Sequence, residues 1–206
     1  MNGNIHVTVA AERRDAGECT GFSPRVCPVS VAPWLDNPFR RWMTGTRRLA
    51  GKYLAPGMAV LDIGCGPAPM LADIARVIGP EGRIICADIQ REMLERVARK
   101  ARRLGLQDQV RLHLSHPEHV GLEAGIADAA IAYWMVHEAP DPHQLIIQVI
   151  DILKPGGRFI IIEPAMHVSK TDFNTMINAL KSLKLTIESV SQGWLNRTLV
   201  IRTLEP

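Results

Sequence analysis

The sequence lacks any run of roughly eighteen apolar residues, the length that a membrane-spanning helix needs. Residues 1–22 also lack the continuous apolar region of a secretory signal peptide, and they show no sustained hydrophobic period. We therefore expect a cytoplasmic protein without a membrane span, whose first residues form a mobile tail.

Cysteine is scarce: the 206 residues include four, at positions 19, 27, 65 and 86, with no paired metal-ligand spacing. Cys65 and Cys86 fall at the ends of neighbouring predicted strands, where we expect them to fill small buried spaces. His113, His116 and His119 recur at every third position, but a strand sends alternate side chains to opposite faces. The three imidazoles therefore do not converge easily, and we expect no metal site.

An excess of one charge is also absent. The sequence has 24 Lys and Arg and 21 Asp and Glu, and this net charge of +3 is too small to indicate a nucleic-acid partner. Basic residues gather on one predicted helix, but acidic residues interleave with them, which is typical of a solvated outer face. The basic residues are Arg91, Arg96, Arg99, Lys100, Arg102 and Arg103, and the acidic ones are Glu92 and Glu95.

From residue 59 onward, predicted strands and helices alternate. Strands are expected at 59–63, 83–87, 110–114, within 126–133 and at 159–162, and helices at 70–78, 91–104, 142–152 and 170–182. A closing antiparallel pair is expected at 185–190 and 198–202, and a further helix over 38–54 that is interrupted near Gly45. This alternation predicts an α/β protein with a Rossmann-like, doubly wound, mostly parallel sheet in three αβα layers.

The most informative stretch runs from Val60 to Ala68, where a buried strand breaks into a turn with glycines at 64 and 66. Glycines there let a ligand approach the backbone where a side chain would collide. Asp88 ends the next strand, where a carboxylate can accept hydrogen bonds from both hydroxyls of a ribose. The unit predicts an adenosine-type binding site.

Two kinds of adenosine ligand compete. A dinucleotide-binding turn has the spacing G-x-G-x-x-G, but Pro69 stands at the third glycine position. Asp62 lies two residues before Gly64, and a carboxylate there would repel a diphosphate. It suits a ligand that carries positive charge and no phosphate. These residues favour S-adenosylmethionine over the nicotinamide cofactor of an oxidoreductase.

The chain resembles the class I S-adenosylmethionine-dependent methyltransferases, and most of all the broad group that contains the ubiquinone/menaquinone-biosynthesis enzymes. Residues 62–67 match that family's first motif, acid-x-Gly-x-Gly, and Asp88 matches its ribose-binding acid. Residues 153–157 match the turn before its fifth strand, and the last of its seven strands is antiparallel. Ala68 stands where the family commonly has glycine; with a negative φ it costs little, so we expect a slightly tighter site.

The resemblance implies S-adenosyl-L-methionine as cofactor and S-adenosyl-L-homocysteine as its product. Tyr133 would border the methionine part of the cofactor, and Ser115 and His116 lie in the loop that borders adenine in this family. The residues expected to bind the cofactor are Asp62, Gly64, Cys65, Gly66, Asp88, Ile89, Ser115, His116 and Tyr133.

Methyl transfer from a sulfonium needs mainly orientation, and it needs a base only if the acceptor is protonated when bound. His137 and Glu138 follow the fourth strand, on the rim that the resemblance assigns to the acceptor, and they are the candidate catalytic residues. Alternatively, His137 caps the following turn. Glu163 and His167 lie on the rim after the fifth strand and are candidate substrate-binding residues, although Glu163 equally suits a structural acid.

The segment before the first strand is aromatic-rich and contains two arginines between residues 34 and 42. The resemblance implies a lid over the cofactor here, with Trp34 and Arg41 as candidate substrate-binding residues; the alternative is a helix that only covers exposed core. We thus expect a tail over 1–22, a helical lid over 23–50 and a methyltransferase domain over 51–206.

The expected function is methyl transfer to a small or medium-sized organic acceptor. The alternatives are an RNA or protein methyltransferase and a non-catalytic S-adenosylmethionine-binding protein, since one scaffold supports many acceptors. An RNA-methylating enzyme would present the basic helix at the mouth of the cofactor site.

Overall fold

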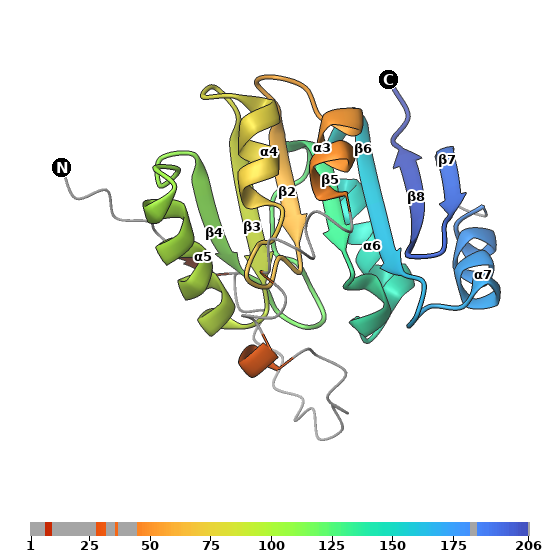
Figure 1. Ribbon diagram of the computed structural model, residues 1–206. Coiled ribbons are helices and arrows are strands. Elements are labelled where there is room, and N and C mark those ends of the chain that lie inside the picture. Colours follow the sequence, from red (N-terminus) through yellow and green to blue (C-terminus); the bar gives the residue numbers. More distant parts are fainter. Residues whose placement is uncertain (1–6, 10–27, 32–35, 37–44, 182–184, 206) are drawn as a thin grey trace.

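The computed structural model describes residues 7–9, 28–31, 36, 45–181 and 185–205. They form an eight-stranded sheet in the order β1-β4-β3-β2-β5-β6-β8-β7, with helices on both faces (Figure 1). The strands are β1 (Val7–Val9), β2 (Ala59–Ile63), β3 (Arg83–Asp88), β4 (Val110–Leu114), β5 (Ala127–Tyr133), β6 (Leu153–Pro164), β7 (Thr186–Gln192) and β8 (Asn196–Arg202).

The α-helices lie between these strands. They are α3 (Thr46–Tyr53), α4 (Leu71–Ile78), α5 (Arg91–Arg103), α6 (Pro142–Ile152) and α7 (Lys170–Leu180), and two short 3₁₀ turns are η1 (Val29–Val31) and η2 (Val136–Glu138). α6 begins with Pro142 behind Asp141, whose side chain accepts a hydrogen bond from Gln144 N, an N-cap that the sequence favours at this position.

β2 runs parallel to β3 and β5, and β8 runs antiparallel to β6 and β7. The predicted α/β class, with a mostly parallel sheet and an antiparallel last strand, is confirmed. Parallel strands place their carboxyl ends at one edge of the sheet, which is the lower edge in Figure 1. Ligands of doubly wound sheets bind along that edge.

Both faces of the sheet are covered by apolar packing, which explains why the strands read as continuous apolar runs. Val60 and Ile131 lie in the core beneath α3, α4 and α5, whereas Leu61 and Ala130 lie in the core beneath α6 and α7. The two cores make the three αβα layers seen in Figure 1.

Two segments differ from the sequence-based expectation. Val7–Val9, within the expected tail, pairs in parallel with β4, because three consecutive β-branched residues suit a strand at an open sheet edge. β6 begins at Leu153, which pairs with Ala127 across a register shift, so the expected turn at 154–157 is part of the strand. The expected interruption near Gly45 agrees with α3, which begins after Gly45 with its φ of 68°, whereas residues 38–44 of the expected helix lie outside the described residues.

Most of the predicted lid lies outside the described residues, including Trp34 and Arg41, and it stays a prediction. Among the residues that the structure describes, none of the helices has the length and apolar character needed to cross a membrane.

Candidate active site

A cavity of about 780 Å³ lies at the carboxyl ends of the parallel strands. Its walls come from the loops after β2, β3, β4, β5 and β6 and from the start of α6. The alternation of strand and helix therefore brings together side chains that are far apart in the sequence, such as those of Ile63 and His167, as the doubly wound topology predicts.

The turn after β2 uses its two glycines differently. Gly64 has a φ of 61°, and a Cβ there would lie 2.6 Å from Cε of Met135. Gly66 has a φ of 52°, and its amide donates a hydrogen bond of 2.7 Å to Oδ2 of Asp88. A substitution at Gly64 therefore meets both backbone strain and a clash, whereas one at Gly66 meets backbone strain.

Ala68 has a φ of 48°, so the expectation of a negative φ is wrong. The residue closes the turn through its amide, which bonds to Cys65 O, and its own carbonyl accepts from the amide of Leu71 in α4. The loop geometry thus demands the left-handed conformation that favours glycine, at a cost of about 1–2 kcal/mol for alanine. Trp134, which lines the cavity after β5, is the other described non-glycine residue with a positive φ, at 60°.

Asp62 lies beneath the turn, 2 % exposed, and its Oδ2 has no hydrogen-bond partner among the described residues. Burial raises the pKa of this carboxyl to about 7; Lys100 opposes the rise, and the charge of Asp88 adds to it. A buried carboxylate oxygen without a partner is costly unless a ligand supplies one. Asp62 does not itself line the cavity, so it acts on a ligand through its charge, which favours a positively charged group and disfavours an additional anion.

Asp88 ends β3 and lines the cavity, although it is buried and does not stand on an open rim. Its carboxylate accepts hydrogen bonds from the amides of Gly66 and Gln90. Burial raises its pKa, and the backbone hydrogen bonds from Gln90, Gly66 and Ile89 act against the rise. A carboxylate has about four lone-pair sites, so ribose hydroxyls can still bond to it.

The loop after β4 brings Ser115 and His116 to the cavity wall. The hydroxyl of Ser115 is buried and has no hydrogen-bond partner among the described residues. The rings of His116 and His119 stack at 4.8 Å, whereas His113 is buried and bonds to Val120 O. The three imidazoles thus have different partners: two stack on each other, and the third is hydrogen bonded to a backbone carbonyl.

Cys65 and Cys86 are both buried, as predicted. Burial, together with a hydrogen bond to Cys86, raises the pKa of the Cys65 thiol well above its ordinary value. The thiol at the cavity wall therefore stays protonated and is no nucleophile.

At the other end of the cavity, Nδ1 of His137 is hydrogen bonded to Oε2 of Glu163. Glu163 is buried at the end of β6, and its Oε1 accepts a hydrogen bond of 2.9 Å from the amide of Val136. Burial lowers the pKa of His137, but the hydrogen bond and charge of Glu163, with the charge of Glu138, outweigh it, so the pKa is raised.

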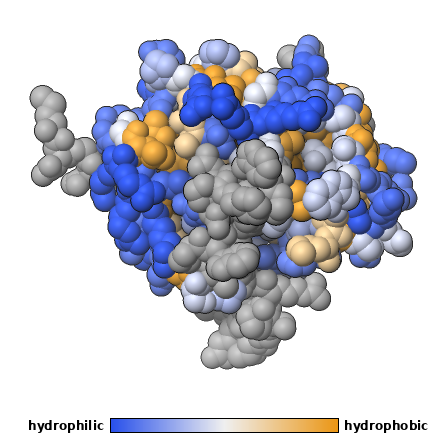
Figure 2. Space-filling view, viewed as in Figure 1, coloured by the Kyte–Doolittle hydropathy of each residue, from blue (hydrophilic) through white to orange (hydrophobic). Residues whose placement is uncertain are grey.

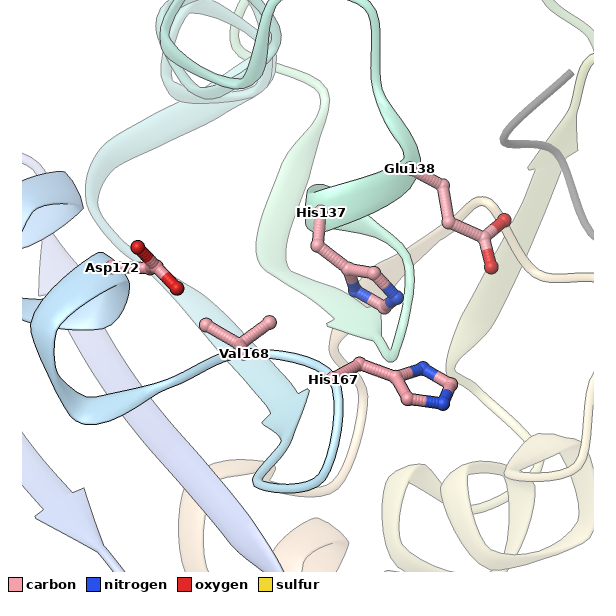
Figure 3. A pocket seen from close by; sticks show the side chains of 5 residues that line it. All are labelled: His137, Glu138, His167, Val168 and Asp172. Carbon is pink, nitrogen blue, oxygen red and sulfur yellow. The ribbon is translucent and has the colours of Figure 1, made fainter. Parts of the chain in front are cut away.

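His137 also borders a smaller hollow of about 520 Å³. Figure 3 shows its lining: His137 and Glu138 come from η2, His167 and Val168 from the loop after β6, and Asp172 from α7. The rings of His137 and His167 meet edge to face at 5.6 Å. Because Glu163 holds Nδ1 of His137, Nε2 is the nitrogen that remains for a ligand.

The predicted cofactor-binding residues lie together. Eight of them line the cavity: Gly64, Cys65, Gly66, Asp88, Ile89, Ser115, His116 and Tyr133. Asp62 lies beneath the turn, and the candidate acceptor-side residues His137, Glu138 and His167 line the same cavity. Glu163 is not at the cavity surface but behind His137, so the structure does not place it for direct contact with a substrate.

Sequence reasoning missed two residues that contribute to the structure of the site. Met135 fills the space against Gly64, and Lys100, assigned to a solvated basic face, is 7 % exposed. A signal existed for the lysine, because it lies seven residues after Met93 and three after Val97, on the buried side of α5. Of the arginines of α5, Arg91, Arg99, Arg102 and Arg103 are exposed and Arg96 is half-buried, and Figure 2 shows a hydrophilic surface on the side of the molecule that carries this helix. From α5, only Met93 lines the cavity.

The fold and the cavity define a Rossmann-like α/β protein whose site suits an adenosine ligand with a positive charge and no diphosphate. Comparison with known proteins agrees with this class. A family model described as a methyltransferase domain matches residues 54–198. The chain belongs to this family, the class I S-adenosylmethionine-dependent methyltransferases, whose cofactor is S-adenosylmethionine.

Two curated relatives and one solved structure illustrate the likeness. An uncharacterized 37.1 kDa protein in a transposon of Streptomyces fradiae is 29% identical over 151 residues, covering 73% of this chain and 43% of that protein. A ubiquinone/menaquinone biosynthesis C-methyltransferase of Idiomarina loihiensis is 31% identical over 115 residues, covering 56% of this chain and 46% of that enzyme. The predicted resemblance to that group is confirmed, and the chain spans about half the length of these relatives.

A crystal structure of an S-adenosylmethionine-dependent methyltransferase from Aquifex aeolicus superposes with a TM-score of 0.78 at 21% identity. The match covers 87% of this chain and 100% of that one, and it shows a shared fold.

Proposed function

We propose that this protein transfers the methyl group of S-adenosylmethionine to a small or medium-sized organic acceptor. The observation that supports the proposal is that one cavity contains both a site for the methyl donor and a candidate base for the acceptor. The glycine turn with Asp62 and Asp88 lies at one end, and the His137–Glu163 pair lies at the other.

The donor end fits the cofactor by its chemistry. Asp62 places a buried acidic group beneath the turn, which favours a positively charged ligand, and Asp88 at the cavity wall offers its remaining lone pairs to the ribose hydroxyls. The buried hydroxyl of Ser115 would bond in the adenine region. When bound, S-adenosylmethionine supplies an already activated methyl group, so the protein's task is to orient the acceptor and exclude water.

At the acceptor end, we assign the role of general base to His137. Glu163 accepts the Nδ1–H proton in a hydrogen bond, which fixes the tautomer in which Nε2 carries the lone pair. An acceptor that is protonated when bound can give its proton to Nε2, and the raised pKa of His137 makes the imidazole a stronger base. Glu163 is thus a positioning residue, while Glu138 and His167 are acceptor contacts.

A small acceptor is favoured over RNA by the placement of α5. Its exposed arginines, which would serve as phosphate contacts, are not among the residues that line the cavity. The Idiomarina loihiensis relative is named for C-methylation in quinone biosynthesis, which supports a small organic acceptor without identifying its reacting atom.

Two measurements test the proposal. Titration calorimetry should detect one binding site for S-adenosylhomocysteine and none for NAD; tight NAD binding alone would overturn the donor assignment. An isotopically labelled methyl donor is then incubated with metabolite, RNA and protein fractions of a cell extract. We expect label in a low-molecular-weight product, and label confined to RNA or protein would contradict the acceptor class.

A further inference from the structure

Lys100 is a buried lysine that contacts the glycine turn, and it has no part in the proposed methyl-transfer step. Lys100 of α5 is 7 % exposed, and Nζ lies 2.6 Å from Ala68 O, 3.3 Å from Pro67 O and 2.6 Å from Asp36 Oδ1. Lysine is almost never buried unless it is paired, and an ammonium carries three N–H donors. Lys100 therefore directs its donors at the turn and at one carboxylate.

The contact with Ala68 explains how the turn keeps an unfavourable backbone conformation. Ala68 holds a φ of 48°, and its carbonyl oxygen accepts from the ammonium group. Hydrogen bonds to an ionised donor are roughly twice as strong as neutral ones. The bond from Lys100 therefore offsets the strain at the residue that links the donor turn to α4.

The same ammonium acts on Asp62 through its charge. Burial and Asp88 both favour the protonated form of Asp62, and Lys100 is the group that opposes them. Within the part of the chain that the structure describes, the titratable groups near this region are Asp88 and Cys86 from β3, Cys65 from the turn, and Asp36 on the far side of the ammonium. Lys100 is the cation among these groups, so it supports the ionised carboxylate that a positively charged ligand needs.

We propose that Lys100 is a positioning residue for the methyl donor: it holds the turn at Pro67 and Ala68 in its binding conformation and supplies the positive charge that supports an ionised Asp62. Asp36 balances that charge from the segment before β2. The inference rests on the proposed donor site, and it assigns part of the donor affinity to a side chain that does not line the cavity.

The test uses titration calorimetry of the full chain with S-adenosylhomocysteine, from about pH 6 to pH 9, which spans the pKa of Asp62 of about 7. Lys100→Met removes the charge and keeps an unbranched side chain, and Lys100→Arg keeps the charge. Arg99→Met is the matched control, because Arg99 is the exposed neighbour on the same helix. Asp36→Asn is a second probe that leaves the buried lysine in place.

In the parent protein, affinity should rise with pH as Asp62 ionises. Lys100→Met should bind at least about tenfold more weakly at pH 7.5, and its pH midpoint should move up, because the charge that favours ionised Asp62 is gone. Asp36→Asn should move the midpoint down, because a negative charge is removed. Lys100→Arg should keep the parent midpoint, and Arg99→Met should match the parent throughout.

A rescue separates the two actions of Lys100. Adding Ala68→Gly to Lys100→Met should recover part of the affinity, since glycine adopts the turn conformation without help. It should leave the raised pH midpoint unchanged, because the charge stays absent.

Unchanged affinity and midpoint in Lys100→Met would overturn the inference, as would a lower melting temperature with an unshifted midpoint, which indicates a merely structural lysine. If Lys100→Met fails to fold, an unshifted midpoint in Asp36→Asn overturns it instead. No binding of S-adenosylhomocysteine by the parent would overturn the donor site itself, a result distinct from these.

Discussion

The proposed donor and acceptor ends of the cavity differ in whether backbone or side chains form them. The donor end consists mainly of backbone: a turn with positive φ values at Gly64, Gly66 and Ala68, backed by two buried carboxylates. The acceptor end consists of side chains, above all the His137–Glu163 pair. A site for one invariant ligand can be set by backbone conformation, whereas a site for an acceptor that differs between enzymes is set by replaceable side chains.

The two ends also differ in how their buried charges are satisfied. At the acceptor end, Glu163 is bonded to His137 and to the amide of Val136, so its burial is compensated within the protein. At the donor end, Asp62 keeps an oxygen without a described partner. Substitutions at the donor end should therefore lower ligand affinity while raising folding stability. Substitutions at the acceptor end should change turnover.

The largest effect is expected for His137→Ala. Loss of a general base should slow methyl transfer by roughly 10²-fold or more, while the donor dissociation constant stays within about a factor of three. Single-turnover rates with the acceptor found in the extract assay, together with calorimetry, measure both quantities. Glu138→Gln is the neighbouring control. Unchanged turnover would remove His137 from the catalytic role, and lost donor affinity would move it to the donor end.

Glu163→Gln should change the pH dependence of turnover. A base works when neutral, so activity rises with pH through the pKa of His137, which Glu163 raises. The glutamine removes that charge, and the acid limb of the rate profile should move to lower pH with a reduced plateau, on the order of tenfold. A limb that stays in place would show that Glu163 does not set the protonation of His137.

Asp88→Asn should weaken binding of S-adenosylhomocysteine by about 1–3 kcal/mol, the usual effect of losing charge-assisted hydrogen bonds. The amide keeps one acceptor for the Gly66 or Gln90 amide, so the variant should fold. Calorimetry measures the affinity and circular dichroism checks the fold. Parent-like affinity would exclude Asp88 as the ribose ligand.

Asp62→Asn should stabilise the unliganded protein above pH 7 while weakening donor binding. Asp62 has a folded pKa of about 7, above its unfolded value of about 3.9, so its burial costs stability that grows as pH rises between these values. The gain should be roughly 1–4 kcal/mol at pH 8 and close to zero below about pH 4. Urea unfolding at both pH values tests this; a gain that is equal at both would contradict it.

The smallest effect is expected for Ala68→Gly. Relief of the left-handed strain, about 1–2 kcal/mol, is partly offset by the entropy of glycine in the unfolded chain, leaving a net gain of about 0.5–1 kcal/mol. Ala98→Gly, inside α5, is the matched comparison and should lose about 1 kcal/mol. Thermal unfolding measures both, and a loss at Ala68 would contradict the strain.

The features that the sequence could predict are those set by local signals along the chain, and the features that it could not predict depend mostly on contacts between distant segments. The bounds of β2 and α6 match the predictions, because an apolar run and an N-cap are local signals. The donor turn was predictable for the same reason. The sign of φ at Ala68 and the place of Glu163 behind His137 depend on packing between segments distant in sequence, and no local pattern predicts them. The burial of Lys100 could have been predicted from its helical spacing from Met93 and Val97.

Hydrogen exchange of the full chain, with and without saturating S-adenosylhomocysteine, tests most directly whether the cavity is divided into a donor end and an acceptor end. Our account predicts slower exchange at residues 64–68, 88–90 and 115–120, and little change at 136–138 and 165–168. Protection confined to the acceptor segments, or none at the donor segments while calorimetry shows the ligand bound, would contradict it.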